Sequence, residues 1–106
     1  MDSLTVVTRY LQRRAHQDVA GILALLTTDV VLCVNGISYE GLVAVRKYLT
    51  ENYLPTISQY DPILLPDGRV GWNMKVRKFW LPVSVYTVFT VRDSEISRID
   101  VTASLF

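Results

Sequence analysis

The chain has 106 residues and a mass of 12.1 kDa, a size at which we expect one domain spanning residues 1–106. Half of the residues are hydrophobic, which excludes intrinsic disorder. Eleven Lys and Arg balance ten Asp and Glu, so there is no basic surface of the kind that nucleic acid requires. With one cysteine, Cys33, and one histidine, His16, an internal disulfide and a zinc site with several Cys or His ligands are excluded. We expect neither a metal nor a cofactor.

The sequence also lacks the features of a membrane protein. No apolar run approaches the ~18 residues that a spanning helix needs. The first residues do not form the hydrophobic core of a signal peptide. The cytoplasm is the expected location, and no membrane partner is expected.

Helical spacing dominates the first part of the chain. Leu4, Val7 and Leu11 recur at i, i+3 and i+7, which predicts a helix capped at position 2 or 3. Tyr10 lies on an adjoining stripe and is expected to face inward. Asp18 then caps a second, short helix.

Residues 30–53 predict a short hairpin followed by a third helix. The β-rich run 30–35 ends in Asn35–Gly36, a strong turn signal, and 37–39 returns as a second strand. The third helix runs from about Leu42 to Tyr53 and is ended by Pro55.

After Pro55 the sequence alternates as in an antiparallel sheet. The expected strands are 57–65, 69–78, 83–91 and 96–105. Pro66–Gly68 is the best turn signal in the chain, whereas the segment between Arg77 and Pro82 must turn without Gly, Asn or Asp. The predicted class is α+β: a curved antiparallel sheet wrapped around three N-terminal helices, which gives a cone.

Three segments carry a resemblance to a known family. Val6–Tyr10 (VVTRY) with Asp18–Leu25 (DVAGILAL) resembles the opening of the bacterial ketosteroid isomerases. Tyr39–Gly41 leading to Val45–Leu49 resembles the entry to their third helix, and Ser94–Val101 resembles their last strand. The chain is similar to the nuclear transport factor 2-like superfamily, which also includes limonene epoxide hydrolases and SnoaL-like polyketide cyclases. The resemblance implies the cone-shaped fold and leaves the activity open.

The resemblance implies only part of a catalytic site. Tyr10 matches the tyrosine that donates a hydrogen bond to the developing enolate in the isomerases. The general base of that family falls at Val34 and its second acid near Thr87, so two of the three roles have no carrier. Leu32 and Val34 likewise replace a tyrosine and an asparagine of the epoxide hydrolases. Steroid isomerase activity is therefore not expected.

The strand alternation predicts a largely apolar pocket with Tyr10 and Thr87 as polar groups. Its expected lining is Val30, Leu32, Val34, Trp72, Met74, Val76, Val85, Phe89, Ile99 and Val101. Such a pocket suits a small apolar molecule held by one or two hydrogen bonds.

Asp100 is the acid that most affects the functional hypotheses. The register places it with Arg98 and Thr102 on the outer face of the sheet, and a shift of one residue would turn it into the pocket. Three functions therefore stay open: a small-molecule-binding domain without chemistry, an isomerase, cyclase or epoxide hydrolase that uses Tyr10 and Asp100, and a protein-interaction module. The half-apolar outer face, with Tyr86 and Val88, predicts a homodimer through the convex side of the sheet.

Overall fold

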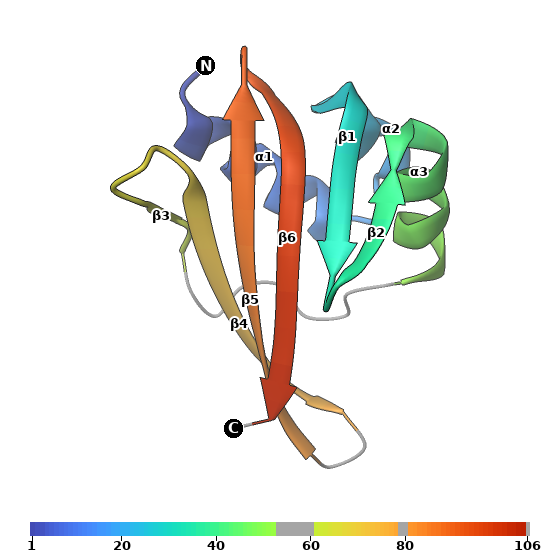
Figure 1. Ribbon diagram of the computed structural model, residues 1–106, viewed down its shortest axis with the longest axis vertical. Helices are drawn as coiled ribbons and strands as arrows, with labels where there is room; N and C mark the ends of the chain where they lie inside the picture. The colour runs from blue at the N-terminus through green and yellow to red at the C-terminus, as the bar shows by residue number, and fades with distance from the viewer. Residues whose placement is uncertain (53–60, 79–80, 106) are drawn as a thin grey trace.

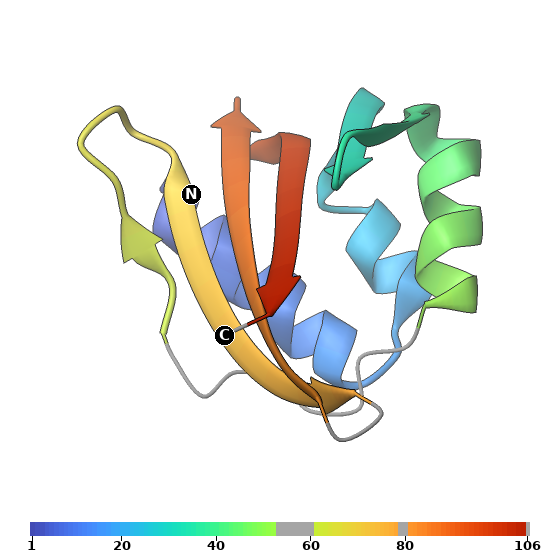
Figure 2. The same ribbon diagram turned by 60° about the horizontal axis from the view of Figure 1, so that its bottom comes forward.

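The computed structural model describes residues 1–52, 61–78 and 81–105, and it places three helices against one face of a curved six-stranded sheet (Figure 1; Figure 2). The α+β class is as predicted. No helix in the described part of the chain is long and apolar enough to cross a membrane. The elements are α1 (Ser3–Ala15), α2 (Val19–Leu23), β1 (Leu26–Val34), β2 (Ile37–Glu40), α3 (Gly41–Glu51), β3 (Ile63–Leu64), β4 (Val70–Lys78), β5 (Leu81–Arg92) and β6 (Glu95–Leu105).

Side-chain caps start the first two helices where the sequence predicts them. The Asp2 carboxylate accepts a hydrogen bond from the Thr5 backbone N–H at 2.8 Å, and Asp18 accepts one from Gly21 N–H at 2.9 Å. These bonds satisfy backbone donors that have no partner within the helix. The third helix ends at Glu51, with Asn52 as its C-cap, and the expected extension to Tyr53 lies outside the described residues.

The strand order is β2-β1-β6-β5-β4-β3, and one of its pairings corrects the prediction of a purely antiparallel sheet. Strands β1 and β6 are parallel, with Leu32 opposite Ile99 and Val34 opposite Val101. Parallel neighbours need a long connection, and here the whole middle of the chain supplies it. The last strand therefore joins the β1–β2 hairpin to the β3–β5 meander.

The turns follow the sequence signals where the structure describes them. Asn35 and Gly36 both have positive φ, 47° and 87°, which is the conformation of a tight hairpin turn. β3 contains only Ile63–Leu64 of the expected strand, whose first residues, 57–60, lie outside the described part. β4 reaches Lys78 and β5 begins at Leu81, so the turn itself also lies outside it.

Alternation along the strands separates a buried inner face from an outer face. On β4, Val70, Trp72 and Met74 are buried, whereas Asn73 and Lys75 are exposed. The helices cover the inner face and bury Val6, Val7, Leu11, Ile22, Val45 and Leu49 against it. One hydrophobic core therefore fills the space between the sheet and the three helices.

Candidate functional site

On the inner face of the sheet, some side chains of each row beyond the first are partly accessible, whereas Trp72 and Met74 on β4 stay buried. Three cross-strand rows follow from the register: Leu32, Ile99, Phe89 and Val70; then Val34, Val101, Thr87 and Trp72; then Ala103, Val85 and Met74. The first row is buried throughout. In the second row Val34 and Val101 are only partly buried, and in the third row so are Ala103 and Val85. The predicted lining residues thus share one face, with Val30 buried on the same strand as Leu32. The side chain of Val76 lies outside the described part.

Tyr10 lies inside, as predicted, and touches the first row. Its ring meets Phe89 edge to face, with the centroids 5.2 Å apart. It is 6% exposed, and burial raises the pKa of its phenol, an effect that the nearby positive charge of Arg14 opposes. The phenol therefore stays protonated at neutral pH and is available as a hydrogen-bond donor.

Arg14, which the sequence analysis assigned no function, is buried beside Tyr10. It follows Tyr10 by four residues on α1, so both point to the same side of the helix. Arg14 is 6% exposed, and its Nη1 donates a hydrogen bond to the carbonyl of Asn52, the C-cap of α3, at 2.9 Å. Its Nε is buried without a hydrogen-bond partner in the described structure. The signal for this residue was present in the sequence, because Val7, Leu11 and Arg14 continue one helical stripe.

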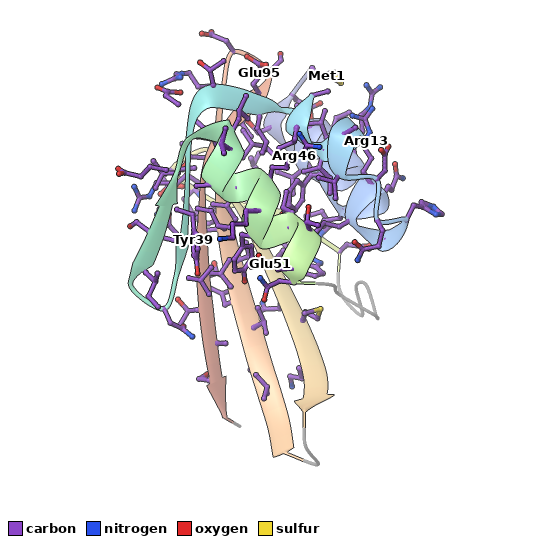
Figure 3. The ribbon with its side chains drawn as sticks, turned by 90° about the vertical axis from the view of Figure 1, so that its right-hand side faces the viewer. Met1, Arg13, Tyr39, Arg46, Glu51 and Glu95 are labelled. Atoms are coloured by element: carbon purple, nitrogen blue, oxygen red, sulfur yellow. The ribbon has the colours of Figure 1, made fainter. Side chains whose placement is uncertain are left out.

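Two further tyrosines lie at the same end of the core. Tyr48 on α3 packs against Tyr39 on β2, with ring centroids 4.9 Å apart, and Figure 3 shows Tyr39 beside α3. Burial raises the pKa of Tyr48, and the Arg14 charge opposes this shift too. We call Tyr10, Arg14, Tyr39 and Tyr48 the arginine–tyrosine cluster. It forms the polar end of an otherwise apolar inner face.

Asp100 is not part of this cluster, so the hypothesis of a Tyr10–Asp100 pair needs correction. Asp100 alternates with the buried Ile99 and lies on the outer face, where its carboxylate accepts two hydrogen bonds of 3.0 Å from Arg98 Nε. The sheet separates it from Tyr10. The register predicted from the sequence is the one that the structure has.

A hollow lies on the outer face, where the sequence predicted none. It has a volume of about 450 Å³ and is lined by Asp61, Ile63, Leu65, Gly71, Asn73, Lys75 and Tyr86. Gly71 makes room for it, because a Cβ at this position would come within 2.8 Å of the Tyr86 hydroxyl. The short strand β3 forms its rim. No group of three or more His, Cys, Asp or Glu side chains within the described ranges is arranged to hold a metal ion.

Comparison with protein-family profiles and with curated proteins finds no match, whereas comparison with solved structures finds close likenesses. A protein from Sphaerobacter thermophilus is 23% identical, with a TM-score of 0.81 over 100% of this chain and 97% of its own. An NTF2-like protein of unknown function from Cytophaga hutchinsonii is 8% identical, with a TM-score of 0.78 over 98% of this chain and 92% of its own. SalBIII is 21% identical, with a TM-score of 0.78 over 94% of this chain and 88% of its own. It is described as an epoxide hydrolase/cyclase-like enzyme in pyran ring formation in the polyether salinomycin.

These likenesses extend over nearly the whole chain. At such identities they establish the fold and leave the chemistry to the residues themselves. The chain therefore has the fold of the nuclear transport factor 2-like superfamily.

Proposed function

We propose that the chain binds a small, largely apolar molecule on the inner face of its sheet. The observation that carries the proposal is the change in accessibility along this face: beyond the fully buried first row, the apolar side chains of Val34, Val101 and Val85 are only partly buried. Apolar side chains that a fold leaves partly open on a concave face are the usual lining of a ligand site. Tyr10 and Thr87 supply the few polar groups that orient a ligand there.

The same residues favour binding without acid–base catalysis. Val34 and Thr87, at the two positions where the resemblance would place a base and an acid, both lie in the second row, on either side of Val101. All ten Asp and Glu lie in the described part, where nine are exposed and Asp100 is half-buried on the outer face. A general base must reach the proton that it abstracts, and no carboxylate is in a position to do so on the inner face.

Binding of N-phenyl-1-naphthylamine, a neutral apolar molecule that fluoresces in a dry environment, tests the proposal. We expect saturable binding that weakens several-fold in Val101→Gln, because the amide would lie where the ligand needs apolar contact. Val88→Gln is the matched control: it is a partly buried valine of the neighbouring strand, on the outer face. No saturable binding, or equal weakening by the two variants, would contradict the proposal.

The enzymatic alternative is supported by the fold likeness to SalBIII, whose description is epoxide hydrolase/cyclase-like. It would have to work without a carboxylate on the inner face. A β,γ-unsaturated steroid ketone provides the discriminating assay, because isomerisation produces a conjugated enone with strong ultraviolet absorbance. We expect the wild-type rate to equal the uncatalysed background, and turnover above background would show that the site is catalytic.

A further inference from the structure

We propose that the ligand of the inner face carries an anionic oxygen group, a carboxylate or sulfonate, which Arg14 binds with the help of the neighbouring tyrosine hydroxyls. The inference rests on the proposed function and adds to it the chemical class of the ligand: an apolar body with one negatively charged end. Its basis is a buried guanidinium that no carboxylate of the chain neutralises.

The charges of the chain leave Arg14 without an acidic partner. The three ion pairs among the described residues join Arg69 to Asp67, Arg92 to Asp29 and Arg98 to Asp100. All ten Asp and Glu are described, and none of them forms an ion pair with Arg14. The segment 53–60 contains no acidic residue. A buried charge is costly unless it is paired, so this site favours an anion that comes from outside the chain.

The hydrogen bonds of Arg14 are also incomplete. Nη1 donates to the Asn52 carbonyl, where the positive charge is favourable at the C-terminal end of α3. The guanidinium also hydrogen-bonds to the Tyr10 hydroxyl, which lowers the pKa of that phenol, but the buried Nε–H has no acceptor in the described structure. A carboxylate or sulfonate offers two oxygens that match the guanidinium fork.

The surroundings of Arg14 contain hydrogen-bond donors that favour an anion. Burial keeps Tyr10 and Tyr48 protonated, so each hydroxyl can donate to the same oxygens. Tyr10 also contacts Phe89 in the first row, which connects the charged end to the apolar wall. A ligand anchored at Arg14 would therefore extend its apolar body along the rows toward Val101.

A matched pair of fluorescent probes tests this inference. 8-Anilinonaphthalene-1-sulfonate and N-phenyl-1-naphthylamine share the same aromatic framework, and only the first carries a sulfonate. We expect the sulfonate to bind wild type at least about tenfold more tightly, as a charge-assisted hydrogen bond in a buried site would provide. Arg14→Met should remove this preference and keep the affinity for the neutral probe.

Control variants separate the site from general charge effects. Arg9→Met removes one positive charge from the exposed side of the same helix and should keep the preference for the sulfonate. Arg14→Lys keeps the charge without the planar fork and should retain part of the preference. If Arg14→Met does not fold, Arg14→Lys still tests the role of the guanidinium. Circular dichroism of each variant shows whether it is folded.

The outcomes distinguish the two proposals. If neither probe binds, the proposed function itself fails. If the neutral probe binds wild type and the sulfonate binds no more tightly, the inference about the anion is overturned and the binding site stands. The inference is also overturned if Arg9→Met lowers the preference as much as Arg14→Met does, because the sulfonate then responds to the overall positive charge and not to Arg14.

Discussion

At the scale of single residues, Tyr10 is packed against Phe89 and is 6% exposed, and burial raises the pKa of its phenol above the ordinary value of 10.0. The folded state therefore holds this proton more tightly than the unfolded state. The stability linked to it is complete below pH 10 and is lost as the pH rises from 10 through the raised folded value. We expect the free energy of unfolding to fall less steeply above pH 10 in Tyr10→Phe than in wild type.

Urea unfolding at pH 8 and at several values above pH 10 measures this difference. Burial also raises the pKa of Tyr48, so the free energy of unfolding of Tyr10→Phe should still fall somewhat with pH above pH 10. The double variant with Tyr48→Phe should reduce this remaining slope further. Equal slopes in wild type and Tyr10→Phe would mean that the buried phenol does not contribute to the alkaline transition.

The sequence predicts well whether a side chain faces inward or outward where the helical or strand periodicity determines its direction. The helical stripe placed Tyr10 inside, and strand alternation placed Asp100 outside, both as found. Arg14 was missed because a cation in the last turn of a helix is usually explained by solvent and the helix dipole. Its burial depends on the C-cap of α3 at Asn52, a contact 38 residues away.

At the scale of elements, the start of α2 depends on close contact between Asp18 and Gly21. The Gly21 N–H donates to the Asp18 carboxylate, and a Cβ at Gly21 would collide with that same carboxylate. Gly→Ala in a helix ordinarily stabilises, by roughly 1 kcal/mol. Here we expect the opposite sign: Gly21→Ala should lower the melting temperature by several degrees, because the cap must move away.

A double-mutant cycle isolates the cause. In an Asp18→Ala background the collision is absent, so Gly21→Ala should be neutral or stabilising when followed by thermal unfolding. A similar loss in both backgrounds would show that Gly21 is needed for a reason other than the cap.

The elements themselves were predictable to the extent that their signals are local. Caps, the Asn35–Gly36 turn and the alternating strands 70–78 and 95–105 all follow from short patterns. β1 begins at Leu26, although the sequence predicted the strand from residue 30, because pairing of Leu26 with Ile96 extends the strand across an irregularity. That pairing joins residues 70 positions apart in the chain, and no local pattern specifies it.

At the scale of the whole molecule, the outer face combines apolar and polar side chains in a way that suits a second copy of the chain. Tyr86 is 39% exposed there, Val88 is partly buried, and the Arg98–Asp100 pair offers both charge signs to a partner related by two-fold symmetry. We propose a homodimer through this face. Sedimentation at micromolar concentration should give about twice the mass of the monomer.

Val88→Lys should shift sedimentation toward the monomer while leaving the monomer folded, because Asp100 lies directly opposite and can pair with the new ammonium group. Val43→Lys is the control, since Val43 is 86% exposed on α3, away from the sheet. A monomeric wild type, or a Val88→Lys protein that sediments as wild type does, would argue against a dimer through this face.

The central position of β6 has a consequence for the order in which the chain can fold. β6 follows every other strand in the sequence, yet it separates β1 from β5 in the sheet. As the chain leaves the ribosome, the β1–β2 hairpin and the β3–β5 meander each expose the backbone edge that β6 will cover. Until that strand emerges, both edges are open to pairing with other nascent chains. Closure of the sheet must therefore be a late, long-range step, and fast folding is not expected of this topology.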